Sequence, residues 1–279
     1  MTNGIDVSKW QGAVDFNSVK KAGYDFVIIN AGYGRYISQR DPYFERNYHN
    51  AKAAGLNVGA YWYSYATSAS EAETEAEIFS QVIAGKQFEY PVVFDIEDQS
   101  QANLSNKVIN DMCNAFASYL EKKGYYVCLY SYASFIENRL YANTKKKYDI
   151  WVANFTNAEE PAFSSSYGMW QWSDTGRVSG VSGNVDLNHS YKDYPAIMKA
   201  NGLNGFEKTE TKTEEKKAEP KKETPKPATD WIYHNVVRGD TLWAISKRYG
   251  VSIVEIARLN NIGNVNLIYP GQKLKIKKA

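Results

Sequence analysis

Two carboxylates with one residue between them, Asp95 and Glu97, end a short apolar run that begins at Tyr90. If this run is a strand, both acids point to the same side of it. Like charges held that close raise the pKa of at least one carboxyl group, which then keeps its proton near neutral pH. A protonated carboxylic acid is what cleavage of a glycosidic bond requires. The alternative for an isolated pair of this kind is a strand end whose acids cap a helix or lie in solvent.

Strand-like and helix-like segments alternate on both sides of this pair. Each β-prone run in the first half of the chain is followed by helical signals, and after residue 140 those signals stop. The expected strands are 4–8, 26–31, 58–65, 90–97, 125–130, 149–155, 168–172 and 184–187, and the expected helices are 15–23, 41–55, 70–84, 104–123 and 134–140. Five strand–helix units followed by three strands predict an α/β fold, an irregular TIM-like (β/α)5(β)3 barrel with parallel strands.

In such a barrel the active site lies at the carboxyl ends of the strands. Asp6 and Asp186 end the first and last expected strands, as Asp95 and Glu97 end the fourth. Because the first and last strands are neighbours in a closed barrel, the four acids are expected to meet in one bowl. Aromatic residues end other strands; each alone favours packing, but as a set around an acidic bowl they are predicted to be platforms for sugar rings. They are Tyr33, Tyr61, Tyr63, Tyr65, Trp151, Trp170 and Trp172.

The charge of the chain is uneven, although its net value is only +2. Residues 1–205 carry 18 basic and 22 acidic side chains, residues 206–230 carry seven of each, and residues 231–279 carry eight basic and two acidic. The middle segment is rich in Lys, Glu, Thr and Pro and has no apolar period, which predicts a linker. The tail has the pattern of a small βααβ unit. Its positive charge indicates an anionic surface as partner, with nucleic acid as a weak alternative.

The sequence gives little support for a metal site, a disulfide framework or a membrane span. His49, His189 and His234 have no metal-ligand spacing, and Cys113 and Cys128 form no CxxC pair, so neither a metal nor a cofactor is expected. No apolar run reaches the length of a membrane span. The chain passes straight into a strand pattern, and no signal peptide is expected.

Six motifs, in order along about 190 residues, resemble the family 25 glycoside hydrolases, muramidases often called Chalaropsis-type lysozymes. They are GIDVSKWQG (4–12), FVIINAGYG (26–34), GAYWY (59–63), FDIE (94–97), WQW (170–172) and VDLN (185–188). The resemblance implies hydrolysis of the β-1,4 bond between N-acetylmuramic acid and N-acetylglucosamine in peptidoglycan. One departure is Asn30, where the family commonly has Arg.

The resemblance also implies roles for the four acids. Glu97 is expected to be the general acid that protonates the leaving oxygen. Asp95 is expected to stay ionised and to raise the pKa of Glu97. Asp6 and Asp186 are expected to orient substrate or water and to add negative potential where positive charge develops.

The tail resembles a LysM module through VRGDTLWAIS (237–246), LN (259–260) and YPGQKL (269–274). Such modules bind polymers that contain N-acetylglucosamine, in a groove between the loop after the first strand and the loop before the last. The corresponding residues are Gly239, Asp240, Thr241, Leu242, Asn266, Leu267 and Ile268. The expected organisation is a catalytic domain at 1–205, a linker at 206–230 and a wall-binding domain at 231–279.

A barrel joined to such a module is similar to phage endolysins. This architecture implies bacterial peptidoglycan as partner, no nucleic acid, no membrane insertion and a monomer. It also implies a protein that stays in the host bacterial cytoplasm until its release to the cell wall.

Two alternatives remain open. Family 18 chitinases also carry D-x-E on the fourth barrel strand, within D-x-x-D-x-D-x-E, but Tyr90 and Val93 occupy the two earlier acidic positions here. The second alternative is a non-catalytic wall binder, against which the intact set of four acids argues.

Overall fold

The computed structural model describes residues 1–208, 231–237, 240–260, 262, 268 and 271–278. The chain divides into two compact units, Met1–Thr209 and Glu210–Ala279, each with its own hydrophobic core. Most of the predicted linker, residues 209–230, lies outside the described residues. Within the described ranges no helix combines the length and the apolar character that crossing a membrane requires.

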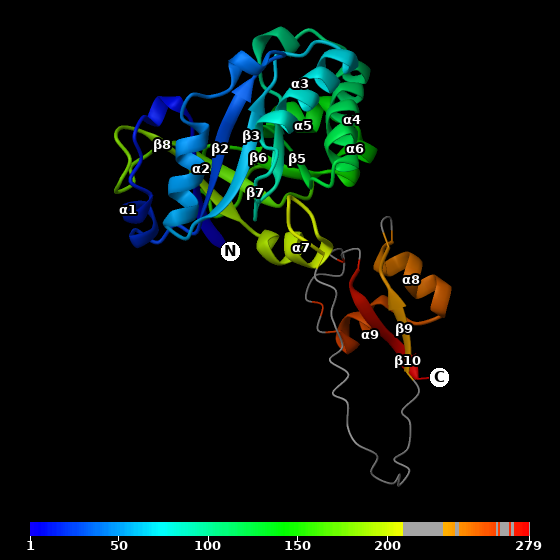
Figure 1. Cartoon of the computed structure of the whole chain (residues 1–279). Coiled ribbons are helices and arrows are strands. Elements are labelled where there is room, and N and C mark those ends of the chain that lie inside the picture. The colour runs from blue at the N-terminus through cyan, green and yellow to red at the C-terminus, as the bar shows by residue number, and fades with distance from the viewer. Residues whose placement is uncertain (209–230, 238–239, 261, 263–267, 269–270, 279) are drawn as a thin grey trace. The chain divides into compact units, whose positions relative to one another are not determined.

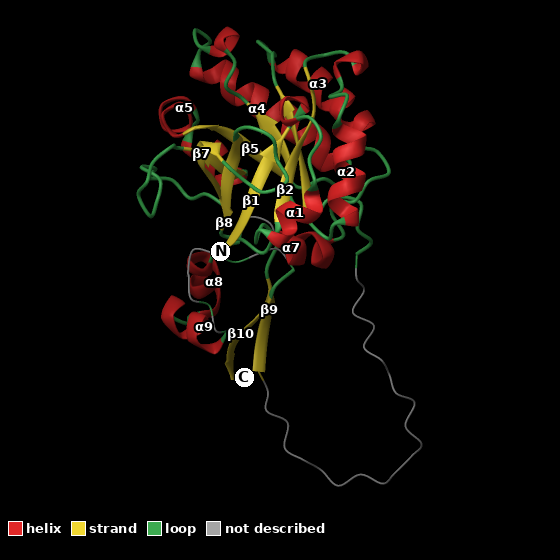
Figure 2. Ribbon diagram, turned by 90° about the vertical axis from the view of Figure 1, so that its left-hand side faces the viewer, coloured by secondary structure: helices red, strands yellow, loops and turns green. Residues whose placement is uncertain are grey.

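The first unit is built on a closed barrel of eight strands, with helices around the outside (Figures 1 and 2). Neighbouring strands from β1 to β7 run parallel. The prediction of an α/β, irregular TIM-like barrel is confirmed. The strands are β1 (Thr2–Val7), β2 (Phe26–Tyr33), β3 (Asn57–Tyr63), β4 (Val92–Asp95), β5 (Val127–Tyr132), β6 (Asp149–Ala153), β7 (Met169–Gly176) and β8 (Val185–Ser190).

The last strand runs against the predicted direction. β8 pairs antiparallel with both β7 and β1. The segment between β7 and β8 has no helix, and a short connection joins antiparallel strands, whereas a parallel pair needs a long crossover. The start of β8, rather than its end, therefore lies at the mouth where the other strands end.

Seven helices belong to the described part of the first unit. They are α1 (Phe16–Lys21), α2 (Phe44–Ala53), α3 (Ala69–Val82), α4 (Asn106–Lys122), α5 (Ala133–Arg139), α6 (Ala142–Lys147) and α7 (Tyr194–Asn201), with short 3-10 turns η1 (Lys9–Gln11), η2 (Ile37–Gln39) and η3 (Gln99–Gln101). The expectation that helices stop after residue 140 is wrong for α6 and α7. The signals of α7 stand in the sequence: Asp193 caps it by accepting from the Ala196 amide at 3.0 Å, and Gly202 ends it in the left-handed conformation.

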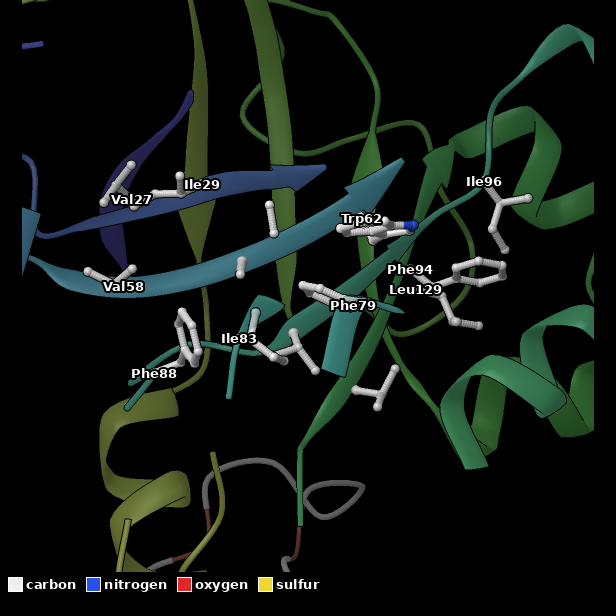
Figure 3. Packing of buried hydrophobic residues seen from close by; sticks show 14 of the residues in the cluster. Val27, Ile29, Val58, Trp62, Phe79, Ile83, Phe88, Phe94, Ile96 and Leu129 are labelled. Carbon is white, nitrogen blue, oxygen red and sulfur yellow. The ribbon is translucent and has the colours of Figure 1, made fainter. Parts of the chain in front are cut away.

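Two apolar layers hold the barrel together. The outer layer lies between the strands and the helices, where Phe94 of β4 stacks on Phe116 of α4 at 4.0 Å. Trp62 of β3 stacks on Phe79 of α3 at 5.4 Å in the same layer (Figure 3). The inner layer fills the barrel itself. Helix α7 lies at the end of the barrel where β1 begins (Figure 1), and its Tyr194 belongs to this inner layer. The packed interior leaves the opposite end as the open mouth.

The second unit has the predicted βααβ order. Strands β9 (Trp231–Asn235) and β10 (Lys273–Lys278) pair antiparallel, and α8 (Leu242–Tyr249) and α9 (Ile253–Leu259) lie between them in sequence. Thr241 caps α8 and Ser252 caps α9, each by accepting a backbone N–H at 3.1 Å. The core consists of Val236, Leu242, Ile245, Ile256, Leu274 and Ile276.

Candidate active site

A cavity of about 690 Å³ opens at the mouth of the barrel. All four predicted acids line it, and so do five of the seven predicted aromatic residues. The lining residues from both sets are Asp6, Asp95, Glu97, Asp186, Tyr33, Tyr61, Tyr63, Tyr65 and Trp151.

The four acids reach this cavity from three strands. Asp6 lies near the end of β1, and Asp95 is the last residue of β4. Glu97 lies two residues beyond the strand, so its place on the strand was wrongly predicted. Asp186 is the second residue of β8 and pairs in register with Asp6. It enters the bowl because β8 is reversed, which corrects the prediction that it ends a parallel strand.

Asp6 is the centre of a buried hydrogen-bond network. Its Oδ2 accepts from Gln171 Nε2 at 2.9 Å and from Asn188 Nδ2 at 2.8 Å. Tyr130 Oη donates to Gln171 Oε1 at 2.7 Å, and Trp151 Nε1 donates to Asn188 Oδ1 at 2.9 Å. These outer bonds fix the two amides with their N–H groups toward the carboxylate. Burial raises the pKa of Asp6 above its ordinary value, and the hydrogen bonds from Asn188 and Gln171 oppose that rise.

Burial is the first cause of every pKa shift among the four acids. It raises the pKa of Glu97 to about 7, with further contributions from the negative charges of Asp6 and Asp98. It raises the pKa of Asp186 to about 9, and Asp6 adds to this as a charge and as a hydrogen-bond acceptor. Glu97 can therefore hold a proton near neutral pH and also release it, as a general acid must.

Asp95 is buried beside Glu97 and has few polar partners. Burial, followed by the charges of Glu97 and Asp6, raises the pKa of Asp95 well above its ordinary value. Its Oδ1 and Glu97 Oε2 are buried without a hydrogen-bond partner among the described residues. Asp95 and Glu97 therefore titrate as an interacting pair, and the pKa of Glu97 is raised first by burial and then by the charges of Asp6 and Asp98.

The segment that carries Glu97 is tied to the barrel on both sides. The Ile96 amide donates to the Tyr130 carbonyl at 3.0 Å. Asp98 accepts from Tyr63 Oη at 3.2 Å. Gln101 Nε2 donates to the carbonyls of Ser64 at 3.1 Å and Ala66 at 3.2 Å. These bonds hold Glu97 in place although it lies outside the strand.

Trp170 and Trp172 do not line this cavity, which corrects their prediction as platforms around the bowl. Side chains alternate along a strand, and Gln171 between them is the residue that faces inward. Trp170 donates from Nε1 to the Asn154 carbonyl at 2.8 Å, and Trp172 stacks on His189 at 5.7 Å. Both tryptophans border a separate cavity of about 490 Å³.

Several residues of the site were missed in the sequence. Gln171 and Asn188 stand inside the quoted WQW and VDLN motifs, where the alternation of a strand would have placed them on the acid side. Trp10 and Lys9 line the mouth; Trp10 is 81% exposed, and the Lys9 ammonium lies 4.9 Å from its ring centroid. A tryptophan that exposed had no distinguishing pattern in the sequence.

The described part of the predicted LysM groove is mostly structural. Leu242 is buried in the core, and Thr241 caps α8. Asp240 Oδ2 accepts from the Val237 amide at 2.9 Å and pairs with His234 Nε2 at 2.7 Å. Ile268 packs against the core. The remaining groove residues, Gly239, Asn266 and Leu267, lie outside the described residues.

Among the residues that the structure describes, no group of three or more His, Cys, Asp or Glu side chains is arranged to hold a metal ion. The chemistry on view is that of carboxyl groups alone: a proton donor of raised pKa, a hydrogen-bonded carboxylate and an open, aromatic-rimmed cavity. A barrel with this site at its mouth is a glycoside hydrolase.

Comparison with known proteins places it more closely: the chain belongs to the glycosyl hydrolases family 25, whose model matches residues 5–181. A LysM domain model matches residues 234–277. The chain is similar to the autolytic lysozyme of Clostridium acetobutylicum, with 36% identity over 66% of this chain and 54% of that relative, so it spans about half of that relative's length.

Two solved structures share the fold. The CTP1L endolysin matches with a TM-score of 0.62 and 32% identity, over 71% of this chain and 69% of that chain. The bacterial lysozyme from Streptomyces coelicolor matches with a TM-score of 0.61 and 33% identity, over 68% of this chain and 92% of that chain. Both likenesses fit the extent of the barrel unit.

Proposed function

We propose that the protein is an N-acetylmuramidase, a peptidoglycan hydrolase that cleaves the β-1,4 bond between N-acetylmuramic acid and N-acetylglucosamine. The proposal rests on Glu97, which lines the open acidic cavity. Burial raises its pKa to about 7, and its buried Oε2 has no hydrogen-bond partner among the described residues. Membership of family 25 and similarity to proteins named lysozymes support the choice of substrate.

In the proposed mechanism Glu97 donates its proton to the glycosidic oxygen as the bond to the muramic acid carbon breaks. Positive charge then develops on the sugar ring. Asp6, ionised and held by two amide donors, supplies the fixed negative potential that stabilises this charge. Water then attacks the anomeric carbon and passes one proton to the Glu97 carboxylate, which restores the acid and completes the hydrolysis. Asp95 and Asp186, which line the same cavity, are placed to form hydrogen bonds with the substrate.

The aromatic residues at the mouth are proposed to bind sugar rings on either side of the scissile bond. Tyr33 and Tyr65 pack edge to face at 5.8 Å and are both more than one third exposed. Their apolar faces suit the carbon side of a hexose ring. Tyr61, Tyr63 and Trp151 line the cavity more deeply.

The second unit is proposed to bind N-acetylglucosamine-containing glycan through the loops at 239–242 and 266–268, with residues 206–230 as the linker between the units. Accumulation in a host bacterial cytoplasm before release to the wall is proposed on the likeness to the CTP1L endolysin. Glycan binding by the second unit and release from the cytoplasm both imply that the protein acts at the cell wall.

Mass spectrometry of digested, purified peptidoglycan tests the activity. Soluble fragments with new muramic acid reducing ends are expected. New glucosamine reducing ends would instead identify a glucosaminidase, and no solubilised fragments would identify a binder.

The variant Glu97→Gln tests the residue that carries the proposal. It keeps the size of the side chain and removes the titratable proton, so the rate is expected to fall by about a hundredfold or more. The matched control is Glu73→Gln, an exposed position on α3, which should retain the full rate. Full activity in Glu97→Gln would overturn the assignment.

A further inference from the structure

One face of the β9–β10 sheet combines lysines with aromatic rings. Along β10 the apolar Leu274 and Ile276 point into the core, while Lys273 and Lys275 alternate with them and point to the other side. Tyr233 of β9 is 46% exposed on that side, whereas its neighbour His234 is buried. The outer face of this sheet is therefore a surface on which lysine side chains lie next to aromatic rings.

Three ammonium groups lie over two rings on this face. Lys275 Nζ lies 4.0 Å and Lys278 Nζ 5.8 Å from the ring centroid of Trp231, and Lys273 Nζ lies 4.6 Å from that of Tyr233. Among the described residues, no carboxylate lies within ion-pair distance of any of the three lysines. Cation–π contact orders these long side chains and leaves their N–H donors free to bind an anion.

The backbone under this face is held firmly. Asn260 accepts from the Lys275 amide at 2.7 Å and donates to the Lys275 carbonyl at 2.8 Å. Strand geometry then sets Lys273 and Lys275 roughly 7 Å apart, since each residue rises about 3.4 Å. A linear polyanion lying along β10 would meet the ammonium groups in turn.

We propose that this face, defined by Trp231, Tyr233, Lys273, Lys275 and Lys278, binds phosphodiester polymers of the bacterial cell wall. The lysines match the phosphates in charge, and the two rings beneath them hold the ammonium groups in place. The choice of a wall polymer over nucleic acid rests on the proposed function. The face lies on the sheet and differs from the proposed glycan groove, which is formed by loops.

The test measures binding without hydrolysis. The full chain carrying Glu97→Gln is titrated onto cell walls that contain poly(glycerol phosphate), before and after hydrofluoric acid removes the phosphodiester polymers. It is also titrated onto soluble poly(glycerol phosphate) and onto duplex DNA. Three forms are compared: the unaltered face, Lys273→Ala/Lys275→Ala/Lys278→Ala, and the same positions changed to Arg. The charge control is Lys122→Ala/Lys123→Ala/Lys146→Ala, at exposed positions of the barrel unit.

The alanine variant is expected to bind untreated walls and the soluble polymer at least tenfold more weakly, while the arginine variant and the charge control bind as the unaltered face does. Loss of three phosphate contacts should lower the slope of log K against log salt by about two. On stripped walls all forms should bind alike. Three outcomes would each overturn the proposal. In the first, the alanine variant binds untreated walls as tightly as the unaltered face does. In the second, it loses as much affinity for stripped walls as for untreated walls. In the third, it loses affinity for duplex DNA alone.

These outcomes are separable from the proposed hydrolysis. Reducing-end formation from stripped peptidoglycan is measured in parallel with Glu97 intact. If no muramic acid ends appear, the muramidase proposal fails, whereas the polymer-binding proposal stands or falls on the titrations. Circular dichroism of the alanine variant establishes that the second unit remains folded.

Discussion

Asp6 and Asp186 face each other in register across the antiparallel pair of β1 and β8. Burial is the first cause of a raised pKa in both carboxyl groups, and the charge of Asp6 adds to the rise at Asp186, whose pKa reaches about 9. Hydrogen bonds from Asn188 and Gln171 oppose the rise at Asp6. Two residues of one type therefore have different surroundings, and Asp186 is the one that keeps its proton to about pH 9.

The first prediction concerns stability and pH in Asp186→Asn. The pKa of Asp186 is about 9 in the folded protein and lies near its ordinary value of 3.8 in the unfolded chain. Between these values the unfolded chain releases a proton that the folded protein keeps, so this group makes folding less favourable as pH rises from about 4 to about 9. Asparagine removes that dependence.

Asp186→Asn should therefore stabilise the protein by about 1 kcal/mol or more at pH 8 and by little at pH 4. Its amide can still donate to Asp6. Chemical denaturation at the two pH values measures the difference. A gain of equal size at both would mean that Asp186 does not hold the proton.

The second prediction is the alkaline limb of the pH–rate profile. Catalysis requires protonated Glu97, so kcat/KM should fall as pH rises through about 7. In Asp6→Asn the negative charge that helps to raise the pKa of Glu97 is absent. The limb should then move to lower pH by about one unit, and the rate should fall by about a hundredfold. An unshifted limb in Asp6→Asn, with Glu73→Gln as the control, would contradict this coupling.

The third prediction separates two aromatic residues that the sequence alone does not distinguish. Tyr33 lines the mouth of the catalytic cavity, while Trp172 borders the separate cavity and stacks on His189. On a soluble glycan fragment Tyr33→Ala should raise KM by about tenfold, the loss expected for one aromatic platform. Trp172→Ala should change kcat/KM by less than about threefold. A larger effect of Trp172→Ala than of Tyr33→Ala would indicate that Trp172 belongs to the substrate site.

The fourth prediction concerns Asp240, which accepts from the Val237 amide and from His234 Nε2. His234 is only 6% exposed, and its Nδ1 is taken by Tyr249 Oη at 3.1 Å. Asp240→Ala leaves two donors without an acceptor and should destabilise the second unit by about 1–3 kcal/mol. Chemical denaturation of the full chain, monitored by a signal from the second unit, measures this loss of unfolding free energy. Weaker glycan binding with unchanged stability would instead make Asp240 a direct ligand.

The fifth prediction compares two substrates after deletion of residues 231–279. If the second unit targets the wall, activity on whole cells should fall by about tenfold or more, because local concentration on the polymer is lost. Activity on short soluble fragments should stay within about twofold. A similar loss on both substrates would show that the second unit supports the fold of the barrel unit.

The sequence by itself determined the architecture and the identity of the four acids. Alternating apolar strands and capped helices specify a barrel through local rules of period and capping, and those rules act over a few residues. Asp6 and Asp95 could be placed at the mouth because strand ends in a barrel converge. Asp186 lies there for a different reason, because β8 is reversed and begins at the mouth. The positions of α6 and α7 were missed because both helices are short, although the caps of α7 were present.

Only the tertiary structure decided the direction of the last strand, the side to which particular side chains point and the ionisation of the buried acids. The reversal of β8 depends on how the barrel closes, and the outward turn of Trp172 depends on register with its neighbours. The raised pKa values of Asp95 and Asp6 depend on burial, and the hydrogen bonds to Asp6 depend on donors brought from β7 and β8. Electrostatic energy is set by distances between groups far apart in the chain, and such distances exist only once the fold has formed.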